Sequence, residues 1–180
     1  MTVKMNRDIP RHILSICLLP GMVTIVIPGI ILWRTGQTNT GWGFPTPWNV
    51  ILVLLGSVFI ITGLVLMVQT ISLFMTIGKG TLAPWDATQK LVIKGPYRYV
   101  RNPMISGVFS ILLGEAILLG SVTLLGWFIL FMLLNMVYIP ISEEPGLLMR
   151  FGNEYTIYKQ HVPRWIPHIR PWNGQEGDQK

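Results

Sequence analysis

Charged residues are scarce in this chain, making up only 12% of its 180 residues. An average soluble domain has roughly a quarter of its residues charged. Apolar residues take their place, since the hydrophobic fraction is 51% and the mean hydropathy is +0.51. This balance excludes an ordinary soluble domain and predicts an integral membrane protein.

Cysteine and histidine are scarce as well. Cys17 is the one cysteine, which excludes an internal disulfide and a cysteine cluster for zinc or iron and sulfur. The histidines, His12, His161 and His168, are scattered without the spacing of a metal site, so we expect no metal. The "GKG" at 78–80 lacks the strand, the helix and the further glycines of a nucleotide-binding fingerprint.

Acidic residues are outnumbered by basic ones, and the net charge is +6. In a soluble protein such an excess would suggest nucleic-acid binding. Here the basic residues lie between apolar runs rather than along one face, so we expect no nucleic-acid partner. Three Lys or Arg precede the first apolar run, one follows it, five lie between the second and third runs, and five follow the last run. By the positive-inside rule, this bias predicts that both termini and the long middle loop are cytoplasmic.

Long apolar runs are what the chain does contain. The first two runs, Ile13 to Trp33 and Val50 to Met75, have about 21 and 26 positions, and a spanning helix needs about 20. The apolar stretch from Met104 to Tyr138 is too long for one span, and Gly120 and Ser121 mark its middle, so we interpret it as two short spans in a tight hairpin. The predicted spans are 13–33, 50–75, 104–119 and 122–139.

The remaining segments are assigned around these spans. Residues 76–103 form a cytoplasmic loop, and 173–180 form a polar tail. Residues 142–167 are predicted to be an amphipathic segment, because apolar and aromatic residues recur at helical spacing at Leu147, Leu148, Phe151, Tyr155, Tyr158 and Val162. It either lies flat on the membrane or inserts as a partial fifth span. The predicted fold is therefore an all-α polytopic membrane helix bundle in one domain, 1–180, with four transmembrane helices and an amphipathic C-terminal helix.

The tight hairpin has a consequence for two polar stretches. Its two ends must meet at one membrane face, which brings "GPYRYVRNPM" at 95–104 close to "ISEEPG" at 141–146. The residues gathered there include two tyrosines, two arginines, an asparagine and two glutamates: Tyr97, Arg98, Tyr99, Arg101, Asn102, Glu143 and Glu144. We predict a polar pocket at the boundary between water and lipid.

Each of these residues also has a purely structural explanation. Asn102 and Pro103 suit the N-cap and the first position of a helix, and the arginines suit charge-based orientation. Glu143 and Glu144 suit the first turn of a helix. The functional alternative is that the helix N-terminus and the arginines hold an anionic group, while a carboxylate accepts two bonds from a ribose diol.

One ionisable residue lies far from this pocket. Glu115 is about 18 Å of helix from Pro103, which is too deep for contact with a water-borne cofactor. An intramembrane carboxylate suggests a function by default, although it can also be protonated or bonded within the bundle. Its role stays open.

Taken together, the two polar motifs resemble a known family. "GPYRYVRNPMISG", with "GKGTLAP" before it and "EEPGLLMRFGNEYTIYKQHVPRWIP" after it, resembles the isoprenylcysteine carboxyl methyltransferase and phospholipid methyltransferase family of integral membrane enzymes. The resemblance covers about half of the chain, 78–167. It implies a methyltransferase that uses S-adenosylmethionine and releases S-adenosylhomocysteine, with a cofactor pocket at the cytoplasmic face and a lipophilic substrate that enters from the bilayer.

The resemblance also implies roles for particular residues. The candidate catalytic residues are Arg101, Arg164 and Glu144. The candidate cofactor-binding residues are Gly95, Tyr97, Arg98, Tyr99, Asn102, Pro103, Glu143, Glu144 and Tyr155. Family members often have histidine where Asn102 stands and commonly have tyrosine where Ile105 stands, so the substrate assignment is less direct than the cofactor assignment.

Two substrate classes remain open. A carboxylate with a pKa near about 3.5 is ionised at neutral pH and needs no general base, and Arg101 or Arg164 would orient it. A lipid amine arrives protonated and needs a base, for which Glu143 or Glu144 is nearest. We expect a lipid-borne carboxylate such as a prenylcysteine α-carboxyl, with a lipid amine as the alternative. An NADPH-dependent sterol-type reductase is disfavoured by the short chain and the missing phosphate-binding loop, and a non-enzymatic membrane protein is the remaining reading.

Overall fold

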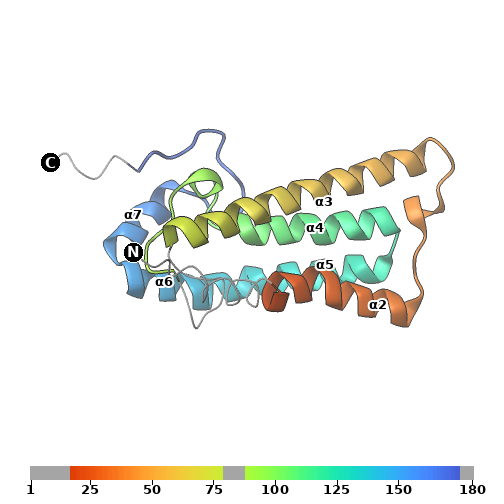
Figure 1. Ribbon diagram of the computed structural model, residues 1–180, viewed down its shortest axis with the longest axis horizontal. Coiled ribbons are helices and arrows are strands. Elements are labelled where there is room, and N and C mark those ends of the chain that lie inside the picture. Colours follow the sequence, from red (N-terminus) through yellow and green to blue (C-terminus); the bar gives the residue numbers. More distant parts are fainter. Residues whose placement is uncertain (1–16, 79–87, 175–180) are drawn as a thin grey trace, which may run out of the picture.

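The computed structural model describes residues 17–78 and 88–174 (Figure 1). The first residues of the predicted first span, part of the middle loop and most of the predicted polar tail lie outside the described residues. Every regular element in the described ranges is helical, which confirms the all-α prediction. The main helices are η1 (Cys17–Val26), α2 (Ile27–Thr35), α3 (Trp48–Leu73), η3 (Phe74–Gly78), α4 (Pro103–Leu119) and α5 (Val122–Tyr138).

Two continuous helices are long and apolar enough to cross a membrane. They are Trp48–Gly78 and Val122–Phe151, with mean hydropathies of 2.9 and 2.2. Helix α4 is apolar but has only 17 residues, near the lower limit for a span. The helices therefore support membrane insertion by length and composition, and the count of four spans stays a prediction.

Glycines bring α3 and α4 close together. A Cβ atom added at Gly63 would lie 2.5 Å from the carbonyl oxygen of Gly107, and one added at Gly56 would lie 2.8 Å from the carbonyl oxygen of Gly114. Small residues at such positions let two apolar helices approach until their backbones touch. α3 and α4 therefore form a rigid pair, and the start of α4 is fixed against α3.

Helix α4 ends and helix α5 begins where the sequence predicts the turn of the hairpin. Gly120 has a φ of 57° in the left-handed region, and its N–H donates to the carbonyl oxygen of Ala116. Ser121 then caps α5, since its hydroxyl oxygen accepts a hydrogen bond from the N–H of Leu124 at 3.4 Å. Two short signals, an αL glycine and a serine N-cap, set both helix ends.

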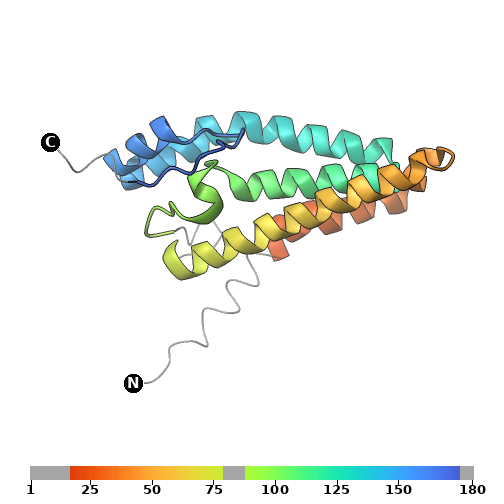
Figure 2. The ribbon, with the colours of Figure 1, turned by 90° about the horizontal axis from the view of Figure 1, so that it is seen from above.

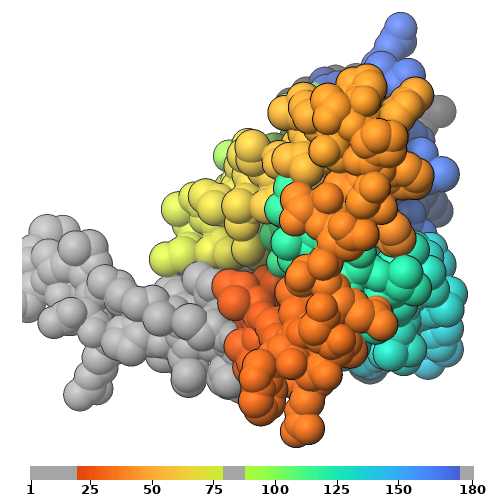
Figure 3. All heavy atoms as spheres, turned by 90° about the vertical axis from the view of Figure 1, so that its right-hand side faces the viewer, coloured from red at the N-terminus to blue at the C-terminus, as the bar shows by residue number. Residues whose placement is uncertain are grey.

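The loop after α2 covers this hairpin. The N–H of Asn39 donates to the carbonyl oxygen of Leu119 at 2.8 Å, and Nε1 of Trp42 donates to the carbonyl oxygen of Ile117 at 3.1 Å. In Figure 3, the view onto this end of the bundle, the orange residues of the loop lie in front of the green and cyan residues of α4 and α5. Hydrogen bonds from a backbone N–H and from a tryptophan side chain thus hold the loop against this end of the bundle.

The C-terminal segment departs from the prediction. Helix α5 continues through η6 (Ile139–Glu143) into α6 (Glu144–Phe151), and α7 (Asn153–His161) follows. The helix predicted within this amphipathic segment is divided in two, because Gly152 at φ 53° and ψ −124° separates α6 from α7. Tyr155, Tyr158 and Val162 still form a buried cluster against Leu147, Phe151, Leu91, Ile93 and Trp172.

Residues 163–172, which we term the C-terminal strap, return along the segment that precedes α4. The N–H of Arg101 donates to the carbonyl oxygen of Pro163 at 2.8 Å, and the N–H of His168 donates to that of Tyr99 at 2.9 Å. The N–H of Trp172 donates to the carbonyl oxygen of Arg98 at 3.0 Å. In Figure 2 the strap, in dark blue, lies beside α6 and α7. It fixes the backbone of the residues just before Pro103.

Candidate active site

A cavity of about 530 Å³ lies at the α6 and α7 end of the bundle. This volume falls within the range of about 300 to 1,000 Å³ that is usual for ligand sites. Its walls come from η1, the start of α4, the end of α5, η6, α6, α7 and the loop at 88–92. Seven of the residues that line it are aromatic: Phe74, Tyr97, Phe131, Tyr138, Phe151, Tyr155 and Tyr158.

Three charged residues line the same cavity: Arg101, Arg150 and Glu143. Glu143 is exposed, and its carboxylate has no hydrogen bond or ion pair with another residue of the described ranges. Arg150 donates one long hydrogen bond, from Nη1 to the carbonyl oxygen of Thr88 at 3.5 Å, and its guanidinium lies over the Phe151 ring, 5.8 Å from the centroid. The cavity therefore contains one carboxylate and two guanidinium groups that a ligand can reach.

Glu144, the neighbour of Glu143, behaves differently. Its side chain is only 4% exposed, and its carboxylate pairs with three cations. Oε1 accepts from Nη1 of Arg101 at 2.9 Å and from Nε of Arg164 at 2.5 Å. Oε2 accepts from Nη2 of Arg164 at 3.0 Å and contacts Nζ of Lys159 at 2.9 Å. Four contacts fill the lone-pair positions of this carboxylate, which is not among the residues that line the cavity.

The contact between Arg101 and Glu144 confirms that the two predicted motifs meet. Arg101 also donates from Nη1 to the hydroxyl oxygen of Tyr155 at 3.4 Å. Its Nε is buried and has no hydrogen-bond partner within the described ranges. Because a buried donor without a partner is costly, this guanidinium is poised to receive an anionic group.

The tyrosines of the cavity wall are held as neutral phenols. Burial raises the pKa of Tyr97 well above its usual value, and the charges of neighbouring groups add to the effect. The hydroxyl of Tyr158 donates to the carbonyl oxygen of Tyr97 at 2.7 Å, and burial raises the pKa of Tyr158 as well. For Tyr155, burial and the charge of Glu144 raise the pKa. These rings therefore offer uncharged aromatic faces and O–H groups at neutral pH.

Arg164 stays cationic for a different reason. Its hydrogen bonds to Glu144 raise the pKa of its guanidinium above the usual value. Both of its bonded nitrogens face the one carboxylate in a two-point contact, the geometry in which arginine binds carboxylates most strongly. Arg164 thus fixes Glu144, which in turn fixes Arg101.

Asn102 occupies the predicted N-cap position of α4, and Pro103 takes the first helical position. Its side chain does not cap the helix. Instead, Nδ2 donates to the carbonyl oxygen of Arg164 at 3.4 Å, and the backbone carbonyl oxygen accepts from N and Oγ of Ser106, both at 3.0 Å. The N-cap side-chain bond expected from sequence is therefore absent, and Asn102 lines the cavity beside Ile105.

The predicted site residues fall into three groups. Five line the cavity: Tyr97, Arg101, Asn102, Glu143 and Tyr155. Gly95, Tyr99 and Pro103 instead line a second hollow on the other side of the same segment. The other three lie outside both: Arg98 donates from Nε to the carbonyl oxygen of Trp172 at 3.0 Å and also bonds Asn173, while Arg164 and Glu144 form the ion cluster.

Sequence reasoning missed several lining residues of α6. Gly146, Leu147, Arg150 and Phe151 line the cavity together with Glu143. Their offsets from Glu143 are three, four, seven and eight residues, which is the spacing of one helix face. That periodicity was present in the sequence and would have identified Arg150.

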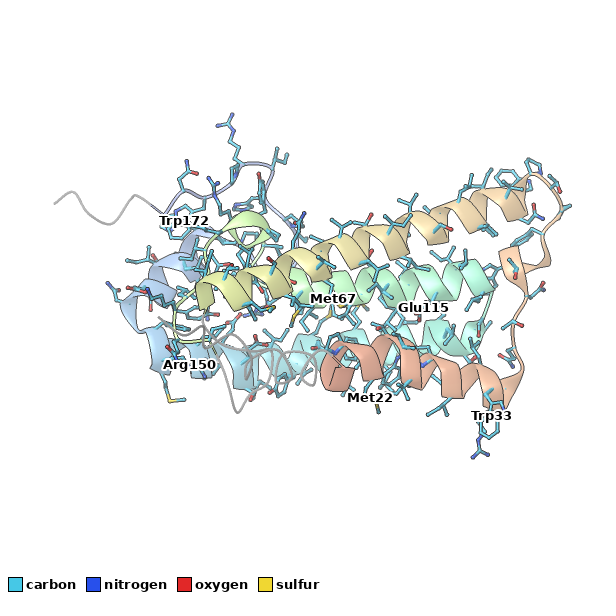
Figure 4. The ribbon with its side chains drawn as sticks, in the orientation of Figure 1. Met22, Trp33, Met67, Glu115, Arg150 and Trp172 are labelled. Carbon is cyan, nitrogen blue, oxygen red and sulfur yellow. The ribbon has the colours of Figure 1, made fainter. Side chains whose placement is uncertain are left out.

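Glu115 lies apart from this cavity. In Figure 4 it is placed on α4 away from the end that carries Arg150 and Trp172, on the side toward α2 and α5. Its Oε2 is buried and has no hydrogen-bond partner in the described part of the chain. The expectation that Glu115 lies too deep for the polar site agrees with this position.

The sequence of the chain matches a known protein family. The model of the phospholipid methyltransferase family matches residues 51–154, more than half of the chain, and the chain belongs to this family. It is similar to the protein-S-isoprenylcysteine O-methyltransferase of Schizosaccharomyces pombe, with 38% identity over 81 residues. That match covers 44% of this chain and 34% of the relative, so it spans about a third of the relative's length. No solved structure matches the chain.

Proposed function

We propose that this protein is a membrane methyltransferase that transfers a methyl group from S-adenosylmethionine to a lipid-borne carboxylate such as a prenylcysteine α-carboxyl. Family membership and the similar isoprenylcysteine methyltransferase support the reaction class. The observation that carries the substrate class is Arg101, a cavity-lining guanidinium whose Nε is buried without a partner in the described residues.

The cavity fits the proposed cofactor in size and chemistry. When bound, S-adenosylmethionine supplies an activated methyl group on a positively charged sulfur. Aromatic rings attract cations, and seven aromatic residues line this cavity. Glu143 offers a free carboxylate for a ribose diol, and Tyr97, Asn102 and Tyr155 stand around it. We assign these four residues to cofactor binding.

Electrostatics favours an anionic substrate near Arg101. One carboxylate, Glu144, shares Arg101, Arg164 and Lys159, so this cluster carries two positive charges in excess. An opposite charge is stabilised most where water is partly excluded, as it is around the buried Arg101 side chain. A substrate carboxylate would take up the free Nε of Arg101 and lower the excess charge.

In this mechanism the chain orients the reactants and removes no proton. A carboxylate is already ionised at neutral pH, so it would need no general base to accept a methyl group, whose bond to the sulfonium sulfur would break as the neutral thioether leaves. Arg101 holds the carboxylate, Glu144 and Arg164 hold Arg101, and the aromatic walls exclude water. Glu144 and Arg164 are positioning residues in this scheme, because their contacts are to each other and to Arg101.

A lipid amine is the second candidate substrate, and the unpaired carboxylate of Glu143 among the described residues favours it. An amine arrives protonated and must lose a proton before it attacks. Glu143 is the cavity's free carboxylate, whereas Glu144 is saturated by its cations. The matching family is described by phospholipid substrates, which also supports this alternative.

The cytoplasmic orientation of the site is part of the proposal. Lys90, Lys94, Arg98 and Arg101 precede α4 and Arg170 lies in the strap, and by the positive-inside rule these basic residues favour a cytoplasmic position for this end of the bundle. Cofactor would then enter from the aqueous side, while the lipid enters between helices from the bilayer.

Calorimetry of the purified full chain tests the cofactor assignment. We expect S-adenosylhomocysteine to bind and NADPH to give no heat of binding. Glu143→Gln should weaken S-adenosylhomocysteine binding by about tenfold, because a hydrogen bond to a charged group contributes about 1.5 kcal/mol or more. Glu154→Gln, a change at an exposed glutamate of α7 that does not line the cavity, is the matched control. Binding of neither ligand would refute the proposal, and binding of NADPH alone would favour a reductase.

A further inference from the structure

A second hollow of about 430 Å³ lies on the opposite side of the segment that forms the cavity wall. We term it the crevice; α3 contributes Leu66 and Gln69 to it, the segment before α4 contributes Gly95 and Tyr99, and the strap contributes Pro167. Its walls are mostly apolar. Residues 97–102 thus divide two sites, because Tyr97, Arg101 and Asn102 line the cavity while Tyr99 and Val100 line the crevice.

The crevice opens beside surfaces that a bilayer would cover. On α3, Val65 and Val68 flank the crevice residues and are exposed. On the strap, Ile166 is 80% exposed and Ile169 is 97% exposed. Isolated apolar side chains on a surface are common, but here they border an apolar hollow on two sides. Lipid chains would bury all of them together.

The strap lies at the depth of the first turns of α4. Trp165 stacks on Phe109 with ring centroids 5.5 Å apart and an interplanar angle of 28°. Phe109 is six residues into α4, or about 9 Å along the helix axis. The strap therefore reaches past the start of an apolar helix, and tryptophan is the side chain most typical of this interfacial depth.

Two residues that can carry positive charge, His168 and Arg170, lie three and five positions after Trp165 in the strap. The backbone of His168 is bonded to Tyr99, a residue of the crevice wall, and Arg170 lies two positions further on. Both side chains are exposed. Near a membrane surface, basic residues attract anionic phospholipid headgroups.

From these observations we propose that the crevice and the strap form a phospholipid site, separate from the reaction cavity. One acyl chain of a bilayer phospholipid would fill the crevice, Ile166 and Ile169 would enter the same leaflet, and Arg170 with His168 would contact the anionic phosphate. Since residues 97–102 form a wall shared by both sites, an occupied crevice would support the segment that carries Arg101. This proposal does not depend on the chemistry in the cavity.

The site can be tested by native mass spectrometry of the full chain in a neutral detergent, with dioleoylphosphatidylglycerol as the probe. We expect one tightly retained lipid. Gln69→Trp should fill the crevice and weaken retention by at least about tenfold, a factor equivalent to about 1.4 kcal/mol. Val58→Trp adds the same side chain to an exposed position of α3 that is eleven residues from Gln69 and does not line the crevice, so it should leave retention within about twofold of the parent. Equal retention in the two variants would overturn the proposal.

The headgroup contact and the depth of the strap are tested separately. Arg170→Ala should weaken phosphatidylglycerol binding by about fivefold, the contribution of one basic residue at an anionic surface, while Arg34→Ala at the far end should not. In a Cys17→Ser background, a fluorophore at Ile169→Cys should be quenched by brominated lipids more than one at Gln160→Cys in α7. Equal quenching at the two positions, or equal effects of the two arginine variants, would exclude a strap that inserts and binds headgroups.

Discussion

The adjacent glutamates Glu143 and Glu144 give a sharp test of how the site is built. Replacing Glu144 with Gln removes the carboxylate that three cations share, while its size is kept. Loss of one partner from a buried ion pair costs about 3 to 5 kcal/mol, because the remaining charge stays desolvated. Lys159 and Arg164 are 49% and 29% exposed, so they can turn toward water, whereas the Arg101 side chain is 9% exposed and cannot.

Because Arg101 alone would keep a buried, unpaired charge, we expect Glu144→Gln to lower the free energy of unfolding by the lower end of this range. A loss of about 3 kcal/mol corresponds to a decrease in Tm of about 6 to 12 °C for a chain of this length. Glu143→Gln is the matched control, since Glu143 is exposed and has no partner in the described residues; we expect a change of about 0.5 kcal/mol or less. Thermal unfolding followed by circular dichroism in detergent measures both variants. Equal Tm values for the two would refute the assignment of Glu144 as the buried centre of the cation cluster.

Three further predictions address the reaction, the packing and the orientation. Arg101→Ala should raise KM for a carboxylate substrate by about tenfold or more, since it removes a hydrogen bond to a charged group, and should change S-adenosylhomocysteine binding less. Steady-state kinetics measures the first effect and calorimetry the second. An equal loss in both would contradict the assignment of Arg101 to the substrate rather than to the cofactor. Gly63→Ala should lower stability by about 1 to 3 kcal/mol, because its Cβ would meet the Gly107 carbonyl, whereas Gly126→Ala, with no atom within 4 Å, should be neutral or stabilising in thermal unfolding. A reporter fused to the C-terminus should be active only in the cytoplasm, and an external signal would contradict the predicted orientation.

Local signals predicted the helical hairpin well. Gly120 and Ser121 mark its turn because only a few residue types suit an αL C-cap and an N-cap, so sequence alone fixes the boundary. The break at Gly152 was not predicted. The apolar spacing of Phe151, Tyr155 and Tyr158 continues across it almost in phase, so the periodicity of one helix concealed two.

The site was predictable only as far as the hairpin constrains it. The proximity of Arg101 and Glu144 follows from two antiparallel helices with a short turn, and the structure confirms it. The sequence did not show which of the two glutamates faces the cavity. Adjacent residues of a helix differ in direction by about 100°, so the answer depends on whether α5 continues without a break into α6. Pairing of the strap with the residues before α4 has no periodic signal at all, since both partners are irregular backbone.

That pairing has a consequence for biosynthesis. The described apolar helices all precede Pro163 to Trp172 in the chain, so a nascent chain can insert them while the backbone of Arg98, Tyr99 and Arg101 still lacks its partners. Helix insertion and completion of the cavity wall are therefore separate events in time. A chain that stalls before the strap is made would be an inserted bundle with an unfinished wall, so synthesis of the strap would decide when the site is complete.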